Sequence, residues 1–146
     1  MTITVKIHRL HADAAVPAYH SEGAAGFDLA ASADVTVKPG EVTLIPTGLV
    51  IEVPAGYFLG IFARSSTPLK RGLMIPNGVG IVDTDYCGPC DEIKIEVYNF
   101  TAAPVEVKAG DRLAQGLFIP VARAEWIEAR SERQASRGGF GSTGER

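Results

Sequence analysis

In the segment Glu92-Ile93-Lys94-Ile95-Glu96-Val97, charged and apolar side chains alternate at every position. This period of two is typical of a β-strand with one buried face and one solvated face. Alternation or short apolar runs, bounded by turn residues, predict further strands over residues 3–7, 35–37, 42–46, 49–53, 57–63, 105–107 and 112–119. Turn sequences recur about every ten residues, which favours a sandwich or barrel. We therefore predict an all-β fold, a jelly-roll-like β-barrel with at most one short helix, near residues 65–72.

The chain has 146 residues, enough for one domain with its own core, and a formal net charge of −3. This charge repels a polyanion, so we expect no nucleic-acid partner. The sequence contains neither a signal-peptide pattern nor an apolar run of bilayer length, which predicts a soluble, cytoplasmic protein without a membrane partner. Two cysteines are too few for a disulfide-stapled secreted scaffold. We expect a core over residues 1–128 and a flexible C-terminal arm over residues 129–146.

Residues 77–88 read Asn-Gly-Val-Gly-Ile-Val-Asp-Thr-Asp-Tyr-Cys-Gly. Gly78 and Gly80 let the backbone come close to a flat ligand, and the apolar pair that follows anchors the segment in a core. Asp83 and Tyr86 then present a carboxylate and an aromatic ring beside that backbone. The same residue types also form tight hairpins, so this segment alone fits either a hairpin or a binding pocket.

The last stretch of the chain has little to bury except Phe140 and is rich in Arg, Gly and small hydroxyl residues. Its composition alone predicts a flexible tail. The run from Arg137 to Gly144, Arg-Gly-Gly-Phe-Gly-Ser-Thr-Gly, combines a guanidinium, a ring, hydroxyls and unhindered backbone N–H groups. That set suits an arm that wraps around a phosphorylated nucleotide and closes as a lid.

Three further groups of polar residues lie at predicted strand ends. Asp28 stands between apolar neighbours in the segment 25–29, and a predicted strand ends in Arg64-Ser65-Ser66. Each of these fits an ordinary turn or solvated loop as well as an anion site. Gln115, in the segment 110–116, shares its alternation phase with apolar neighbours, so we expect it to face inward, where an amide needs partners.

Taken in chain order, these five segments (residues 25–29, 64–66, 77–88, 110–115 and 137–144) resemble the five ordered motifs of the trimeric dUTP diphosphatases (dUTPases). The resemblance extends from residue 23 to residue 144, and its most specific parts are the segments 77–86 and 138–144. It implies a β jelly-roll homotrimer whose active sites are assembled from all three subunits. It also implies hydrolysis of dUTP to dUMP and pyrophosphate with magnesium, which keeps uracil out of DNA and supplies dUMP for dTMP synthesis.

The resemblance assigns roles to the residues of the third motif. Asp83 matches the carboxylate that orients and activates the attacking water at the α-phosphorus, a reasonable task for a positioned base. Tyr86 matches the ring that packs under the deoxyribose and excludes a 2′-hydroxyl. Uracil is expected to meet mainly backbone groups of the residues Asn77, Gly78, Ile81 and Val82 and of the facing strand near Lys94.

The phosphates and the metal are assigned to the other motifs. Arg64, Ser65 and Ser66 match the phosphate-binding motif, and Gln115 matches the amide that contacts the phosphate chain or the catalytic water. Asp28 corresponds to a carboxylate that meets Mg²⁺ through its water shell, which fits the reluctance of Mg²⁺ to shed water. No direct protein ligand of the metal is implied.

In the arm, Phe140 matches the ring that stacks on uracil, and Gly141 and Ser142 match donors to the phosphates. The usual arm carries its phosphate-binding Arg five residues before the aromatic residue, where this chain has Ala135. Arg137 or Arg133 is left to supply the cation that stabilises the transition state. We favour Arg137 because its Arg-Gly pair is kept.

Three alternatives belong to other classes. The dCTP deaminases share the fold and use a glutamate near the position of Glu96, so a bifunctional dCTP deaminase and dUTPase is one alternative. The run from Cys87 to Cys90 matches a thioredoxin redox motif. In that motif the first cysteine lies at the start of a helix, whereas here a strand is predicted to follow, so a turn is the preferred role. A non-enzymatic jelly-roll binding module would explain the strands but not the arm.

Overall fold

The computed structural model describes residues 2–129, 134–136, 138–139 and 144. The alternating segment 92–97 lies mostly in β9 (Lys94–Asn99), whose Ile95 and Val97 are fully buried. The other strands are β1 (Lys6–Arg9), β2 (Phe27–Ala30), β3 (Val35–Val37), β4 (Val42–Pro46), β5 (Leu49–Glu52), β6 (Tyr57–Ala63), β7 (Leu73–Met74), β8 (Gly80–Val82), β10 (Val105–Val107) and β11 (Arg112–Pro120). Among the described residues there is one helix, α1 (Ser66–Arg71), so the all-β prediction with at most one short helix is confirmed.

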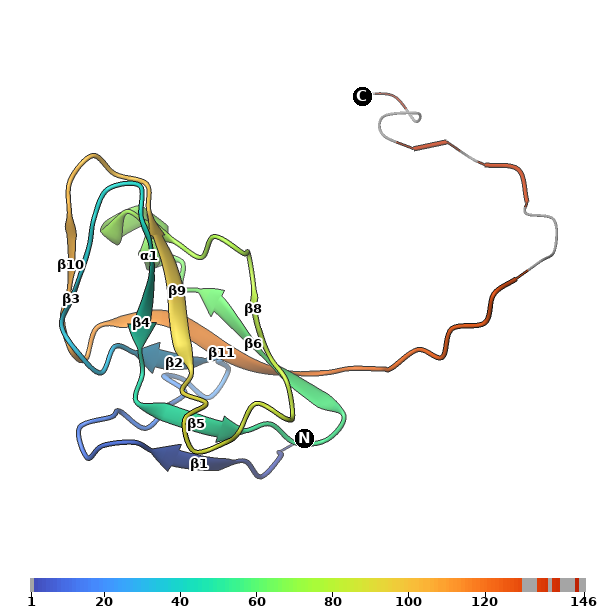
Figure 1. The fold of residues 1–146 in the computed structure, drawn as a ribbon, viewed down its shortest axis with the longest axis horizontal. Coiled ribbons are helices and arrows are strands. Elements are labelled where there is room, and N and C mark those ends of the chain that lie inside the picture. The colour runs from blue at the N-terminus through green and yellow to red at the C-terminus, as the bar shows by residue number, and fades with distance from the viewer. Residues whose placement is uncertain (1, 130–133, 137, 140–143, 145–146) are drawn as a thin grey trace.

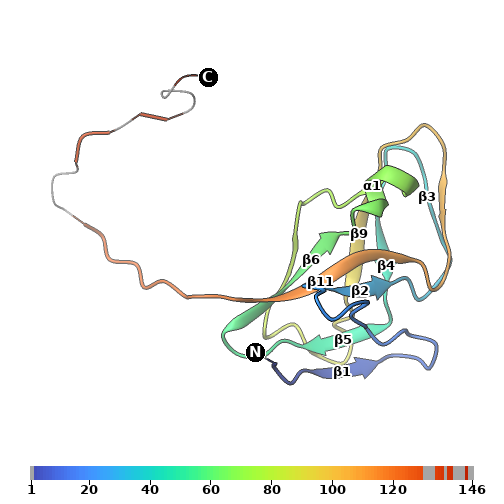
Figure 2. The ribbon, with the colours of Figure 1, turned by 180° about the vertical axis from the view of Figure 1, so that it is seen from behind.

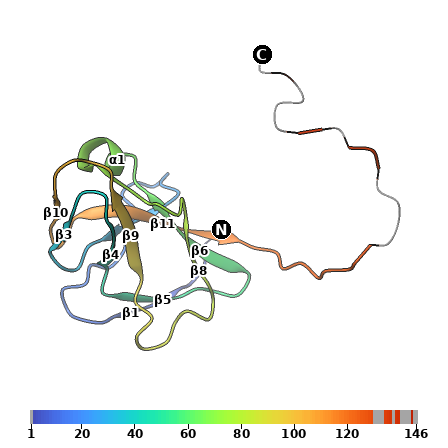
Figure 3. The same ribbon diagram turned by 45° about the horizontal axis from the view of Figure 1, so that its top comes forward.

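The strands form four antiparallel sheets around one apolar core (Figures 1 and 3). The largest sheet has the order β2-β11-β6-β8, the second has the order β4-β9-β7, and two pairs, β1-β5 and β3-β10, complete the fold. Core residues come from every one of these sheets, including the fully buried Leu29, Leu59, Ile95 and Val107. In the part of the chain that the structure describes, hydrogen bonding links the strands as four separate sheets, so a closed barrel stays a prediction.

Predicted and observed strands agree best where alternation is bounded by turn residues. The predictions over 42–46, 57–63 and 105–107 are confirmed by β4, β6 and β10. The first strand begins later than predicted, because its pairing with β5 covers only Lys6 to Arg9. Three short strands, β2, β7 and β8, were not predicted, and each holds its place through a neighbour far away in the sequence.

The helix is fixed at both ends. Gly72 takes a left-handed conformation with φ 66°, and its N–H donates to the carbonyl of Thr67, which ends the helix. The Thr67 side chain is buried and its Oγ1 donates to the Leu113 carbonyl at 2.6 Å. This bond ties the helix to β11, and Arg64 lies in the short connection between β6 and the helix.

After β11 the chain leaves the sheets, as Figures 1 and 2 show. The N–H of Val121 still donates to Gly56, but residues 121–129 have no regular structure, and the side chains of Trp126 and Ile127 are 90% and 86% exposed. The predicted arm residues Arg137, Phe140, Gly141 and Ser142 lie outside the described residues. No helix in the described ranges is long and apolar enough to cross a membrane.

Candidate functional site

A pocket of about 280 Å³ lies between β8 and the facing strand β9. Its wall contains five residues that the sequence predicted for nucleotide binding, namely Asn77, Ile81, Val82, Tyr86 and Lys94. Apolar side chains, among them Ile75 and Ile93, cover much of the remaining wall. The structure therefore places the third motif and the facing strand around one cavity, and the segment 77–88 is both a turn and a pocket wall.

Strand β8 can present backbone groups to a ligand because it lies at the edge of its sheet. Its register with β6 pairs Gly80 with Ile61 and Val82 with Leu59, and no strand of the described chain pairs with its other side. Backbone N–H and C=O groups on an open edge are free to pair with a ligand that has a matching pattern of donors and acceptors. Before the strand, Gly78 has φ 75°, so the turn into β8 favours glycine at this position.

Tyr86 is held at the pocket by its hydroxyl, which donates to the Glu92 carbonyl at 3.1 Å. The Glu92 carboxylate in turn accepts the N–H of Gly48 at 2.8 Å. The Tyr86 side chain keeps 42% of its surface exposed, so one part of the ring stays open to a ligand. This arrangement gives a fixed aromatic plate on the pocket wall.

Asp83 follows β8 directly. The residue is exposed, and its carbonyl accepts the N–H of Tyr86 at 3.3 Å. In the described part of the chain its carboxylate has no ion-pair partner, so it is available to a water molecule. Its side chain does not belong to the pocket wall itself.

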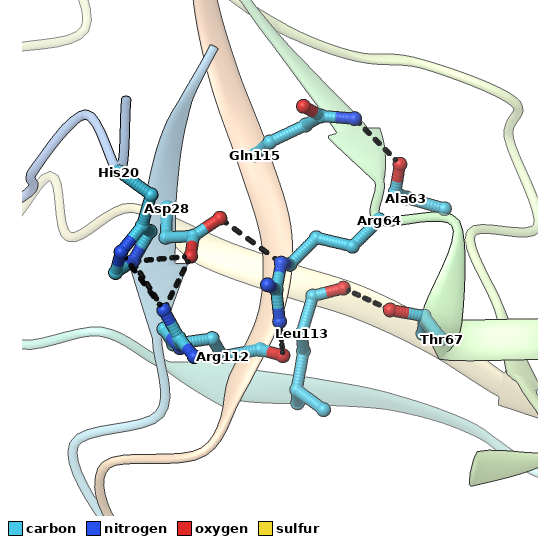
Figure 4. Close-up of polar contacts among 8 residues, drawn as sticks. All are labelled: His20, Asp28, Ala63, Arg64, Thr67, Arg112, Leu113 and Gln115. Atoms are coloured by element: carbon cyan, nitrogen blue, oxygen red, sulfur yellow. Dashed lines mark hydrogen bonds and ion pairs between the residues drawn. The ribbon is translucent and has the colours of Figure 1, made fainter. Parts of the chain in front are cut away.

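A second group of polar residues gathers around Asp28 (Figure 4). One carboxylate oxygen of Asp28 pairs with Arg64 Nε at 3.0 Å, and the other pairs with Arg112 Nη1 at 3.1 Å and with His20 Nε2 at 2.8 Å. Arg112 Nη1 also contacts the imidazole of His20. Arg64 Nη1 further donates to the Arg112 carbonyl at 3.1 Å, so its guanidinium is fixed by two partners.

Gln115 lies beside this cluster, on the face of the sheet that it shares with Asp28. The two residues are opposite one another in the register of β11 and β2, and Gln115 Nε2 donates to the Ala63 carbonyl at 3.1 Å. The prediction that Gln115 faces inward is wrong. A β-bulge between Arg112 and Ala114 shifts the alternation, so Ala114 and Gly116 face the core and Gln115 is only half-buried.

Two residues of the predicted phosphate-binding motif, Arg64 and Ser66, line a depression of about 600 Å³ together with Lys70, Arg71 and Glu106. Ser65 is exposed and makes no side-chain capping bond to the helix. Arg71 Nη1 donates to Asp111 Oδ2 at 2.7 Å, and this hydrogen bond holds the pKa of the Asp111 carboxyl below its usual value. Arg64 and Arg71 are thus each paired with a carboxylate, and of the cations in this depression Lys70 is the one with no ion pair among the described residues.

The donor set does not fit a resident magnesium ion. Among the described residues, no group of three or more His, Cys, Asp or Glu side chains is arranged to hold a metal. Both oxygens of Asp28 face nitrogen atoms of Arg64, Arg112 and His20, which take the place that a second cation would need. Magnesium therefore stays a prediction in its original form, an ion held by substrate phosphates and water that Asp28 meets only through the water shell.

Arg112 and His20 were not predicted from the sequence. Arg112 follows Asp111 at the start of a predicted strand, and a charged residue there is unremarkable in a sequence. His20 reaches the cluster because the N–H of Asp28 donates to the Ala18 carbonyl at 3.1 Å, a bridge that no local pattern announces. Neither residue carried a signal that sequence reasoning could have used.

The chain is similar to dUTPases in sequence and in fold. The dUTPase family model matches residues 12–144. The deoxyuridine 5'-triphosphate nucleotidohydrolase of Desulfitobacterium hafniense is 47% identical over 150 residues, covering 98% of this chain and 97% of that protein. The structure of the dUTPase from Streptococcus mutans is 31% identical and covers 84% of this chain and 98% of its own, with a TM-score of 0.76. The Staphylococcus bacteriophage 80alpha dUTPase with dUPNHPP has a TM-score of 0.86 over 98% of this chain and 99% of its own; at 22% identity it supports the fold alone.

Proposed function

Because the chain belongs to the dUTPase family and is a dUTP diphosphatase, we propose that dUTP binds in the pocket between β8 and β9 and meets the Asp28–Arg64 cluster of a second subunit. The observation that carries this proposal is the pocket itself, since residues distant in sequence, Asn77 and Lys94 among them, line one cavity. The products are dUMP and pyrophosphate.

In this proposal the open edge of β8 reads the base. Fixed backbone donors and acceptors select the O4 acceptor and N3–H donor of uracil, because cytosine presents the opposite polarity at both positions. Tyr86 lies under the deoxyribose and leaves no room for a 2′-hydroxyl. Its hydrogen bond to the Glu92 carbonyl fixes the ring before substrate binds, so the ring cannot move aside to admit a 2′-hydroxyl.

Asp83 performs the chemistry in this proposal. Its carboxylate orients a water molecule toward the α-phosphorus and accepts a proton as the new P–O bond forms. The bond from the α-phosphorus to the oxygen that bridges to the β-phosphate breaks, and pyrophosphate leaves. Alignment of the water is the main contribution, since the reacting phosphate must be approached in line.

Phosphate binding is assigned to Arg64, Ser65, Ser66 and Gln115. Asp28 acts on this group as a positioning residue, because it holds the Arg64 guanidinium at 3.0 Å. The arm residues Arg137, Phe140, Gly141 and Ser142 keep their predicted roles at the phosphates and the uracil ring. Magnesium enters with the triphosphate.

A homotrimer is proposed from the outer face of the largest sheet. In the register of β6 with β11, four apolar side chains share the face that points away from the core, and all four are half-buried: Phe58, Phe62, Leu117 and Ile119. Ile81 on the same face is 65% exposed. An apolar sheet face of this kind is stabilised by a second copy of the chain, and light scattering should give three times the mass of the chain.

Glu96 keeps one alternative open, because it lines the same pocket as Lys94 and Tyr86. A carboxylate at this position is what a bifunctional dCTP deaminase would need. The test is to incubate the protein and Mg²⁺ with dUTP, dCTP, UTP and dTTP separately, measuring pyrophosphate and ammonia. We expect pyrophosphate from dUTP alone; ammonia from dCTP would establish the alternative, and inactivity on dUTP would reject the proposal.

The role of Asp83 is tested by Asp83→Asn. Turnover should fall about 10²-fold or more, while dUTP binding changes little, because the amide keeps the shape but cannot accept the proton. An equal loss of binding and turnover would contradict the assignment. Deleting residues 135–146 should slow catalysis while leaving the unfolding transition of the core in place, and unchanged rates would remove the arm from the mechanism.

A further inference from the structure

The two cysteines of the chain, Cys87 and Cys90, have no part in the proposed catalytic centre. Both are free thiols and both are exposed. They stand three residues apart in the loop that joins β8 to β9, as Cys-Gly-Pro-Cys. Within this loop Tyr86 directly precedes Cys87 and Glu92 lies two residues after Cys90, so the hydrogen bond from the Tyr86 hydroxyl to the Glu92 carbonyl spans the cysteine segment.

The loop contains a tight turn over residues 88–91, directly after Cys87. The N–H of Asp91 donates to the Gly88 carbonyl at 3.1 Å, and the N–H of Gly88 donates to Asp91 Oδ2 at 2.7 Å. A turn of this kind brings the Cα atoms of its first and last residues, here Gly88 and Asp91, within about 7 Å, and Cys90 lies inside it. A disulfide needs a Cα separation of about 4.4–6.8 Å, which two cysteines with only two residues between them can reach in an exposed loop.

We propose that Cys87 and Cys90 are a reversible redox modification site, and that their disulfide changes substrate binding by moving Tyr86. Oxidation proceeds by exchange with a low-molecular-weight disulfide such as oxidised glutathione. The two protein thiols lose two protons and two electrons, the glutathione S–S bond breaks, the Cys87–Cys90 bond forms and two reduced glutathione molecules leave. Exposure of both thiols gives the reagent access.

The link to the pocket is the short chain between the ring and the first thiol. Tyr86 is covalently adjacent to Cys87, and its hydroxyl is held by Glu92, two residues after Cys90. Closing the small ring between the cysteines shifts the backbone on both sides of it. The part of this inference that concerns substrate rests on the proposed role of Tyr86 at the deoxyribose.

The test equilibrates the full-length protein in glutathione buffers from reducing to oxidising, then traps thiols with an alkylating reagent for intact mass measurement. We expect the mass of the reduced chain to show two alkylated thiols. The mass of the oxidised chain should show none, and no bound glutathione. The KM for dUTP should change about threefold to tenfold on oxidation, as for one altered packing contact, and should recover with a dithiol. Cys87→Ser and Cys90→Ser should keep the KM of the reduced wild type in every buffer.

Two thiols that stay trappable in the oxidising buffer, or a stable mixed disulfide with glutathione, would overturn the proposal. So would a disulfide that leaves both the KM and the backbone amide resonance of Tyr86 unchanged. Inactivity of the reduced wild type on dUTP would instead reject the proposed function alone, because the thiol count and the Tyr86 resonance report on the loop without substrate.

Discussion

Two variants that are inactive alone, one changed at Asp83 and one at Arg64, should regain dUTP hydrolysis when they assemble in one oligomer. The reason is the distance between Asp83 and Arg64 within one chain. The register of β8 with β6 pairs Val82 with Leu59, which puts Asp83 across from Phe58. Arg64 is six residues further along, or about 20 Å at 3.4 Å per residue. One phosphate chain cannot place the same reacting phosphorus beside both residues of one subunit.

The perturbation is a pair of variants, Asp83→Asn and Arg64→Ala, each purified and then co-assembled in equal amounts. Each alone should lose about 10²-fold or more of its kcat/KM. In random mixed oligomers, a site that takes Asp83 from one subunit and Arg64 from another is intact in about one case in four. The mixture should therefore reach about a quarter of the wild-type rate.

The assay is pyrophosphate release at saturating dUTP and Mg²⁺, with exchange of subunits verified by mass spectrometry of the intact oligomer. The matched control mixes Asp83→Asn with Tyr86→Ala, two changes on the same side of the site. That mixture should gain no activity over the average of its two parent variants, because both residues come from one subunit. Verified mixed oligomers of the first pair with no gain in rate would refute a site shared between subunits.

Asp28→Asn should lower kcat/KM about tenfold or more at every Mg²⁺ concentration, because Arg64 loses its ionic partner; recovery at high Mg²⁺ would instead favour a metal role. Asn99→Ala should lower the free energy of unfolding by about 3–4 kcal/mol in urea titrations, since the fully buried amide makes four hydrogen bonds of about 1 kcal/mol each; a loss below about 1 kcal/mol would contradict this. The hydrogen bond from Arg71 lowers the pKa of Asp111 below 3.8, so this pair stabilises the fold above that pH and its contribution is lost as the pH falls further. Acid titrations of Arg71→Gln should show less of this loss, and an unchanged acid profile would show that the pair is not its source.

The strands that could be predicted are those whose signal is local. β4 and β6 combine apolar runs with flanking Pro and Gly residues, and their predicted bounds are the observed ones. The pocket was also predictable in part, because Asn77 to Tyr86 form a contiguous segment. Lys94 came to the pocket from the family resemblance, since nothing local to it announces a ligand.

What could not be predicted depends on pairing between distant segments. β2 is only four residues long and holds its place against β11, where Asp28 lies opposite Gln115, 87 residues later in the sequence. The bulge near Arg112 is invisible in a pattern of apolar residues, yet it decides which face Gln115 occupies. His20 lies beside Asp28 for the same reason, through a single bridge at Ala18.

Each subunit carries two parts of the proposed catalytic centre that are organised before they meet. The pocket has its ring fixed by the bond from Tyr86 to Glu92, and the phosphate cluster has its guanidinium fixed by Asp28. Ordering a long Arg side chain at the moment of binding would cost conformational entropy, and here that ordering is part of folding. Assembly then has to join two rigid surfaces rather than build a site from mobile side chains. A shared site of this kind is active only in the oligomer, which makes the apolar outer face of the sheet as necessary to catalysis as Asp83.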